Sequence, residues 1–226
     1  MRVDWLPGDH PLAPALRPLA EAAAARLDLA RHLASLTLWL DDLTADERIW
    51  VTTDVAAVAS APGGLPGLAL WFHPDHFLRD HAPGAAEGGG LLAWELRAGP
   101  VAESCDPAAF SPRKAERILY HQFLMVRDLR DGTVSPAEVP SAGAEAFQEA
   151  WAVTLDGRLK RAILPGYSLA ERRRRFFRVF SAGGVLLPQH WQIFHALWEW
   201  EAPEQTRLLE MLARLPSLPG APRHGR

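Results

Sequence analysis

The first forty residues repeat their apolar positions at helical spacing. Between residues 11 and 40, apolar side chains recur at steps of three and four residues, at Leu16, Leu19, Ala23, Leu27, Ala30 and Leu33. This spacing places them on one face of an α-helix, and Pro14 suits the first turn of such a helix. The pattern therefore predicts an N-terminal helix.

Three segments between residues 48 and 97 have the character of β-strands. Arg48–Thr52 is β-branched and aromatic, and Leu68–Phe72 is an unbroken apolar run of the length expected for a buried strand. In Leu91–Arg97, large apolar residues alternate with small or charged ones, which is typical of a strand with one buried face. Proline- and glycine-rich stretches separate the three segments, so the pattern predicts about three strands in succession.

Helical spacing returns at Ser111 and continues almost to the end of the chain. Ser111 and Pro112 form a typical helix start, with a serine cap and a proline in the first turn, and Asp131-Gly132 ends that helix near Arg130. The pattern predicts further helices over Ala144–Lys160, Leu169–Phe180, Pro188–Glu201 and Leu208–Leu215.

The order helix, strands, helices predicts an α+β fold. We expect a small, mostly antiparallel sheet of three or four strands, packed on the helices between Ser111 and Lys160 and flanked by the N-terminal helix. No linker is long enough to require two domains, so residues 1–226 are predicted to form one. Its core spans about 48–160, and its helical extension spans about 168–216.

Composition narrows the class of protein. The chain has 226 residues, 48% of them hydrophobic, and a formal net charge of −3, which suits a sizeable core and excludes wholesale disorder. A single cysteine, Cys105, cannot form an internal disulfide. The N-terminus lacks the apolar core of a signal peptide, and no apolar run approaches membrane-spanning length. We expect a soluble, cytoplasmic protein with no membrane partner.

The segment His121-Gln122-Phe123-Leu124-Met125 lies within the helix predicted from Ser111. It resembles the active-site helix of zincin metallopeptidases, whose His-Glu-x-x-His motif places two imidazoles on one helical face. In those enzymes the glutamate activates the zinc-bound water. Glu149 on the following helix is similar in position to the glutamate ligand of gluzincin-type members. The resemblance also implies that the strand with Trp94 and Glu95 is the edge that binds an extended peptide.

This segment departs from the motif at two positions. Gln122 stands where the catalytic glutamate is expected and cannot accept a proton at neutral pH, while Met125 stands in place of the second histidine and is a poor zinc ligand. His121 and Glu149 alone are too few ligands for a tight zinc site. We therefore expect a non-catalytic scaffold or a module that binds a peptide or protein partner, without a cofactor or stoichiometric zinc. In it, we expect His121 and Glu149 to face each other and to be hydrogen-bonded. Alternatively, His121 is a buried structural histidine.

A second group of possible ligands lies in residues 73–81, directly after an apolar strand. Pro74 suits the start of a short helix that would bring His73, His76 and Asp80 near one face. Imidazoles and carboxylates together can bind a divalent metal, so a metal-dependent hydrolase is an alternative function. The competing interpretation is that these histidines form capping or solvated pairs with the aspartates.

A basic stretch runs from Arg158 to Arg178, with aromatic residues between its arginines. Arginine combined with stacking aromatic rings is used to recognise nucleic acids, so a nucleic-acid or regulatory binding module is another alternative. The competing interpretation is structural, because consecutive arginines on a helix point in different directions and nearby phenylalanines would anchor it. The surface in question comprises Arg172, Arg173, Arg174 and Arg175.

Overall fold

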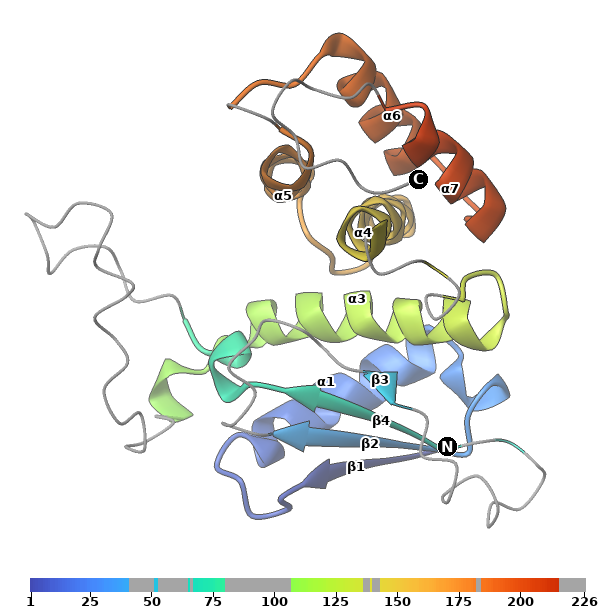
Figure 1. Ribbon diagram of the computed structural model, residues 1–226. Helices are drawn as coiled ribbons and strands as arrows, with labels where there is room; N and C mark the ends of the chain where they lie inside the picture. Colours follow the sequence, from blue (N-terminus) through green and yellow to red (C-terminus); the bar gives the residue numbers. More distant parts are fainter. Residues whose placement is uncertain are drawn as a thin grey trace, which may run out of the picture.

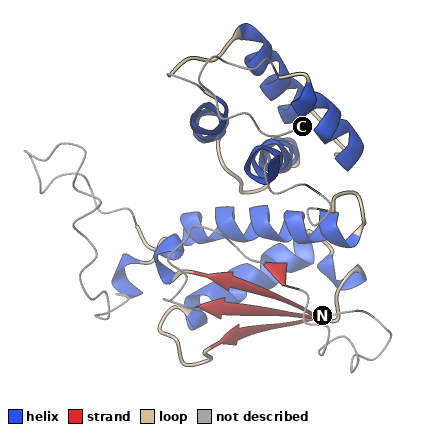
Figure 2. Ribbon diagram, in the orientation of Figure 1, coloured by secondary structure: helices blue, strands red, loops and turns tan. Residues whose placement is uncertain are grey.

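The computed structural model describes residues 1–40, 51–52, 65, 67–79, 107–135, 139, 143–181 and 184–215. A four-stranded sheet forms one side of the molecule, and helices cover one of its faces (Figure 1, Figure 2). Helices α1 and α3 lie nearest the sheet and contact each other, and α4 to α7 form a further helical layer beyond α3. The predicted strand Leu91–Arg97 lies outside the described residues.

The sheet is mainly parallel. Its strands are β1 (Arg2–Leu6), β2 (Ser35–Leu40), β3 (Val51–Thr52) and β4 (Gly67–Phe72), in the spatial order β1-β2-β4-β3. Strands β1, β2 and β4 run parallel, and only β3 runs antiparallel to its neighbour β4. The mixed α and β content is confirmed, but the prediction of a mostly antiparallel sheet was wrong. Helix α1 (Ala13–Arg26) joins β1 to β2, and such a crossover is what parallel pairing requires.

The N-terminal helix is shorter than the apolar spacing suggested. It ends at Arg26, a short 3₁₀ turn follows over Leu29–Arg31, and the chain enters β2 at Ser35. In β2 the burial pattern alternates: Leu36, Leu38 and Leu40 are buried, and the residues between them are not. The leucines of β2 therefore belong to a strand, although they continue the apolar character of the helix before them.

The predicted helices of the second half are confirmed. They are α3 (Pro112–Arg130), α4 (Ala144–Arg161), α5 (Leu169–Phe180), α6 (Pro188–Trp198) and α7 (Gln205–Ala213). Helix α4 contacts α3, α5, α6 and α7, so most of its length is buried. None of the helices in the described part of the chain is long and apolar enough to cross a membrane.

A buried ion pair fastens α3 to α4. Asp128 of α3 is 3% exposed, and its carboxylate accepts hydrogen bonds from the guanidinium of Arg158 and from the indole N–H of Trp151, the latter at 2.9 Å. Both partners lie on α4. This contact near the C-terminal end of α3 fixes how the two helices sit together, and hence which of their side chains face each other.

Candidate functional site

Helix α3 carries His121 into the helical interior. The helix begins as the sequence predicts, with Ser111 accepting a hydrogen bond from the backbone N–H of Lys114 at 3.4 Å and with Pro112 in the first turn. Nine residues further on, His121 is only 4% exposed. Its ring therefore depends on protein groups for its hydrogen bonds.

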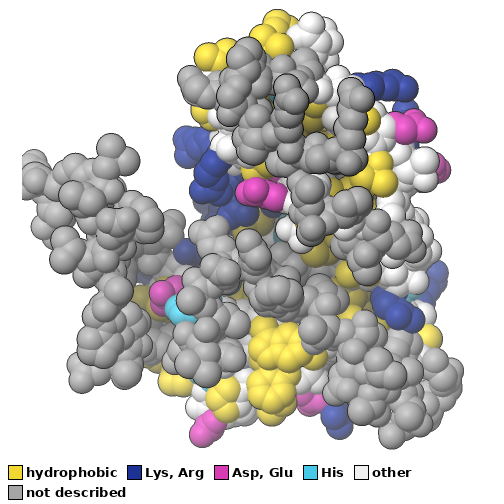
Figure 3. All heavy atoms as spheres, in the orientation of Figure 1, with side chains coloured by type: hydrophobic (Ala, Val, Ile, Leu, Met, Phe, Trp, Pro, Cys, Tyr) yellow, Lys and Arg dark blue, Asp and Glu magenta, His cyan; other side chains and the backbone are white. Residues whose placement is uncertain are grey.

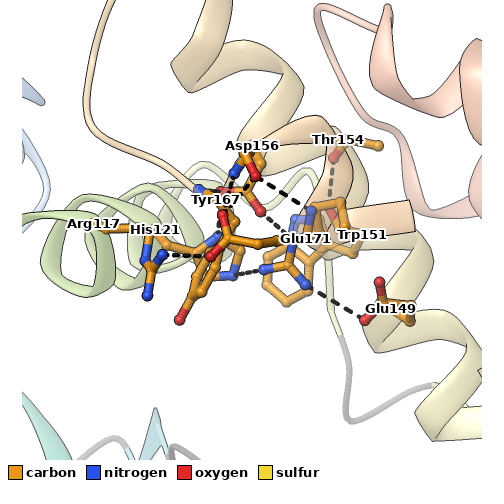
Figure 4. Close-up of polar contacts among 10 residues, drawn as sticks. Arg117, His121, Glu149, Trp151, Thr154, Asp156, Tyr167 and Glu171 are labelled. Carbon is orange, nitrogen blue, oxygen red and sulfur yellow. Dashed lines mark hydrogen bonds and ion pairs between the residues drawn. The ribbon is translucent and has the colours of Figure 1, made fainter. Parts of the chain in front are cut away.

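Asp156 of α4 is the main partner of His121 (Figure 4). The carboxylate is fully buried, and its Oδ1 lies 3.1 Å from His121 Nδ1. The same oxygen accepts a hydrogen bond from the backbone N–H of Tyr167 at 2.9 Å, and Oδ2 accepts one from Nε of Arg172. Asp156 thus joins α3, α4 and the start of α5.

Arg172 of α5 links the candidate motif residues. It is 1% exposed, and its Nη2 lies 3.4 Å from Nε2 of His121, while its Nη1 lies 3.4 Å from Oε2 of Glu149. The N-terminus of helix α5 is stabilised by a capping box, in which the side chains of Ser168 and Glu171 each accept a hydrogen bond from the other's backbone N–H. We refer to His121, Glu149, Asp156 and Arg172 as the buried cluster.

The ring of Tyr167 closes the cluster on one side. It meets the His121 ring edge to face, with the ring centres 5.3 Å apart. The guanidinium groups of Arg117 and Arg172 each lie 4.6 Å from the centre of the Tyr167 ring, and that of Arg175 lies 5.2 Å away. Such cation–π contacts are stronger when they are desolvated, so Tyr167 offers the three guanidinium groups a common partner.

Burial and charge set the protonation states of the cluster. Desolvation, supported by the charge of Arg172, lowers the pKa of His121 despite the opposing pull of Asp156. His121 is therefore neutral at pH 7, and the tautomer that suits the geometry donates from Nδ1 to Asp156 and accepts at Nε2 from Arg172. Burial also opposes ionisation of Asp156, but His121, Arg172 and the N–H of Tyr167 outweigh it and lower the pKa of this carboxyl.

Glu149 is held differently from Asp156. Desolvation raises the pKa of its carboxyl, and the nearby arginines only partly counter that effect. Its Oε1 is buried and finds no hydrogen-bond partner in the described part of the chain, and neither does Oε1 of the buried Gln122. The site therefore contains one well-satisfied carboxylate, Asp156, and one poorly satisfied carboxyl, Glu149.

The structure changes the predicted pairing of the motif residues. His121 and Glu149 are both buried, but the prediction of a hydrogen bond between them was wrong, because His121 bonds Asp156 and Arg172. Glu149 reaches His121 only through the Arg172 guanidinium. The alternative of a buried structural histidine agrees with this geometry, although its partner is Asp156.

Zinc does not fit these residues. The nitrogen and oxygen atoms that would ligate it, His121 Nε2 and Glu149 Oε2, both contact a guanidinium that is always positively charged. Within the described ranges, no group of three or more His, Cys, Asp or Glu residues has the arrangement needed for a metal ion. A divalent cation at this place would have to displace the Arg172 guanidinium from His121 and Glu149.

The histidines that follow β4 are partly described. His73 caps the 3₁₀ helix Pro74–Phe77, its Nδ1 accepting a hydrogen bond from the backbone N–H of Asp75 at 3.2 Å. The ring of His76 lies 6.2 Å from that of His73. Asp80, the third predicted ligand, lies outside the described residues. For His73, the structure supports the capping interpretation.

The predicted basic surface is not continuous. Arg172 belongs to the interior, so placing it on the surface was wrong. Arg175 packs on Tyr167, and Arg173 lies 3.1 Å from Nε2 of His195. Only Arg174 of the four is exposed without such a contact. Basic side chains do gather along the α5 side of the molecule (Figure 3). Trp94 and Glu95 lie outside the described residues.

Asp156 is the functional residue that sequence reasoning missed. It follows Glu149 by seven residues, a spacing that places both carboxyls on the same face of α4, two turns apart. Arg172 also carried a signal, because it precedes the buried Phe176 by four residues and so shares its helical face.

Comparison with protein-family models, curated proteins and solved structures gives no match for this chain. The zincin resemblance predicted from the residues around His121 therefore gains no support from known proteins and stays a prediction.

Proposed function

We propose that this chain is a non-catalytic, zincin-like protein that serves as a scaffold or peptide-binding module. In this proposal Arg172 takes the place of the metal ion. The observation that carries it is the contact of one guanidinium with both His121 Nε2 and Glu149 Oε2, each at 3.4 Å. A metal would join these side chains through ligand bonds, and the arginine joins them through hydrogen bonds and charge.

The charge balance of the buried cluster favours a permanent internal cation. Asp156 is buried and ionised, and an unpaired buried carboxylate is strongly unfavourable. Arg172 supplies the compensating charge without a bound ion. A scaffold of this kind keeps its helices together whether or not zinc is present.

The described residues around His121 offer no free general base that could activate a water molecule for hydrolysis. Gln122 has no basic group at neutral pH, and Asp156, the ionised carboxylate of the cluster, is committed to His121, Arg172 and Tyr167. Binding of an extended peptide has no such requirement, because pairing to a sheet edge uses only main-chain hydrogen bonds. The segment with Trp94 and Glu95, which lies outside the described residues, stays the predicted edge.

The test compares metal content, cleavage and peptide binding in the wild-type protein. Protein prepared without chelator should hold no stoichiometric zinc, and added zinc should leave its Tm unchanged. Peptides selected for binding should bind equally well in chelator and stay uncleaved. Zinc at one ion per chain that disappears in His121→Ala, or cleavage that chelator stops, would show a working metal site and contradict the proposal.

A further inference from the structure

A cavity of about 770 Å³ opens beside the buried cluster. Its wall is built by the first turns of α3 and α5 and by the connection from α4 to α5, which contributes Leu164, Pro165, Gly166 and Tyr167. This volume is within the range of small-molecule sites. Asp156, a member of the buried cluster, and Tyr167, which packs against His121, also line the cavity, so the cavity and the cluster are adjacent.

Basic side chains predominate among the described residues that line this cavity. Five cations face three carboxylates, and two of these carboxylates are already engaged, Asp156 by Arg172 and Glu171 by Arg117. Within the described part of the chain, Arg79, Arg113 and Lys160 form no ion pair. The lining cations are Arg79, Arg113, Lys114, Arg117 and Lys160, and the carboxylates are Glu116, Asp156 and Glu171. Among the described residues that line the cavity, the five cations exceed the three carboxylates by two positive charges, which suits a dianion.

Arg117 retains unused hydrogen-bonding capacity at the cavity wall. Its Nη1 donates to Oε1 of Glu171 at 2.5 Å, and the guanidinium lies over the ring of Tyr167. Its Nε is buried and has no hydrogen-bond partner among the described residues. A buried donor without a partner is unfavourable, and an acceptor oxygen on a ligand would relieve this if the Arg117 side chain turned toward the cavity.

We propose that the cavity binds a small phosphate monoester. The phosphate carries a charge close to −2 at neutral pH and accepts hydrogen bonds on three oxygens, which matches the charge excess and the donors of Arg113, Arg117 and Lys160. The cavity also lies at the N-terminal end of α3, whose dipole favours an anion. Leu164, Pro165 and Tyr167 offer apolar contacts to the organic part of the ligand. This inference is independent of the proposed loss of the metal site.

The experiment uses phenyl phosphate as the probe, with phenyl sulfate at equal ionic strength as the matched monoanion. Titration calorimetry on the full chain should show saturable binding of phenyl phosphate that weakens with salt, and markedly weaker binding of phenyl sulfate. The double variant Arg113→Gln/Lys160→Gln should bind at least tenfold more weakly, because it removes two of the charged donors that line the cavity.

The control Arg130→Gln/Arg174→Gln removes two charges from exposed positions outside the cavity and should bind like the wild type. Thermal unfolding without ligand establishes that each variant is folded. Phenyl sulfate binding as tightly as phenyl phosphate, equal losses in both double variants, or no saturable binding by the wild type would each overturn the proposal.

Discussion

Burying the Arg172 guanidinium has a large desolvation cost, and hydrogen bonds, ion pairs and a ring contact with the surrounding side chains offset it. Asp156, Glu149 and His121 all contact it, and Tyr167 lies against its face. A buried pair of this kind is not necessarily more stable than an apolar core, but removing one partner leaves the other charge unpaired. Removing Arg172 should therefore destabilise the fold, whereas removing an exposed arginine of α5 should not.

Replacing Arg172 should destabilise the fold strongly. Arg172→Ala leaves the Asp156 carboxylate buried without its cation, so we expect the free energy of unfolding to fall by about 3–5 kcal/mol. Arg174→Ala, at an exposed position two residues away, should change it by no more than about 0.5 kcal/mol. Urea denaturation of both variants measures the difference, and similar small losses in the two would contradict the buried ion pair.

The neutral state of His121 should appear in the pH dependence of stability. Because the folded pKa lies below the unfolded value of about 6.5, the unfolded chain takes up a proton first as pH falls below 7. The free energy of unfolding should therefore decrease as the pH is lowered, by at most about 1.4 kcal/mol per pH unit for this group. His190, whose pKa burial also lowers, adds a contribution of the same sign.

His121→Gln should reduce this slope between pH 7 and the lowered pKa, because glutamine does not titrate, while His195→Gln at an exposed position serves as the control. Denaturation curves at a series of pH values give the slope. An unchanged slope in His121→Gln would mean that the histidine is as easily protonated in the folded protein as in the unfolded chain.

Some helices and strands could be predicted from their own sequence, and others could not. Helices α3 and α5 carry their own start signals, a serine cap with a proline or a capping box, and their positions were predicted to within a residue. Strands β1 and β2 were missed. Arg2–Leu6 is short, and the leucines of Ser35–Leu40 continue an apolar helical pattern. Only pairing in the sheet, of β1 with β2 and of β2 with β4, decides their conformation.

The candidate site was predictable only in part for the same reason. His121 and Glu149 lie on helices rich in apolar residues, and α4 is buried along most of its length, so the burial of both side chains was predictable. Which side chain stands between them depends on how α5 packs against α4, and the apolar pattern of neither helix fixes that packing. Arg172 was therefore assigned to a surface, although its spacing from Phe176 places it on the buried face of α5.

The packing of α4 against α6 depends on Gly157. A Cβ at this position would lie 2.0 Å from the carbonyl oxygen of Trp198, so the helices would have to separate. We expect Gly157→Ala to destabilise the protein by about 1–3 kcal/mol or more, as overpacking does. At Gly8, a Cβ would meet only an ordinary contact of 3.8 Å, and Gly8→Ala should be close to neutral. Thermal unfolding of both variants tests this packing, and equal Tm values would contradict it.

In the whole molecule, the buried cluster ties the two helical layers together. α3 lies on the sheet side, α4 and α5 belong to the outer layer, and the cluster takes at least one side chain from each of these three helices (Figure 1). In a metal-binding protein of this arrangement, an ion would make these connections. Here one side chain of the protein makes them, which is the central claim of our account.

Zinc-dependent unfolding of two engineered proteins tests this claim most directly. The first, Gln122→Glu/Met125→His, restores the motif but keeps the Arg172 guanidinium, and its Tm should not respond to zinc. The second adds Arg172→Met, which removes the cation, and zinc at about a hundred times its Kd should then stabilise it by roughly 2.7 kcal/mol, or about 5–10 °C in Tm. Adding Arg174→Met instead should leave the first protein insensitive to zinc. A zinc-dependent rise in Tm while Arg172 is present would contradict the claim, as would a folded triple variant that still does not respond to zinc.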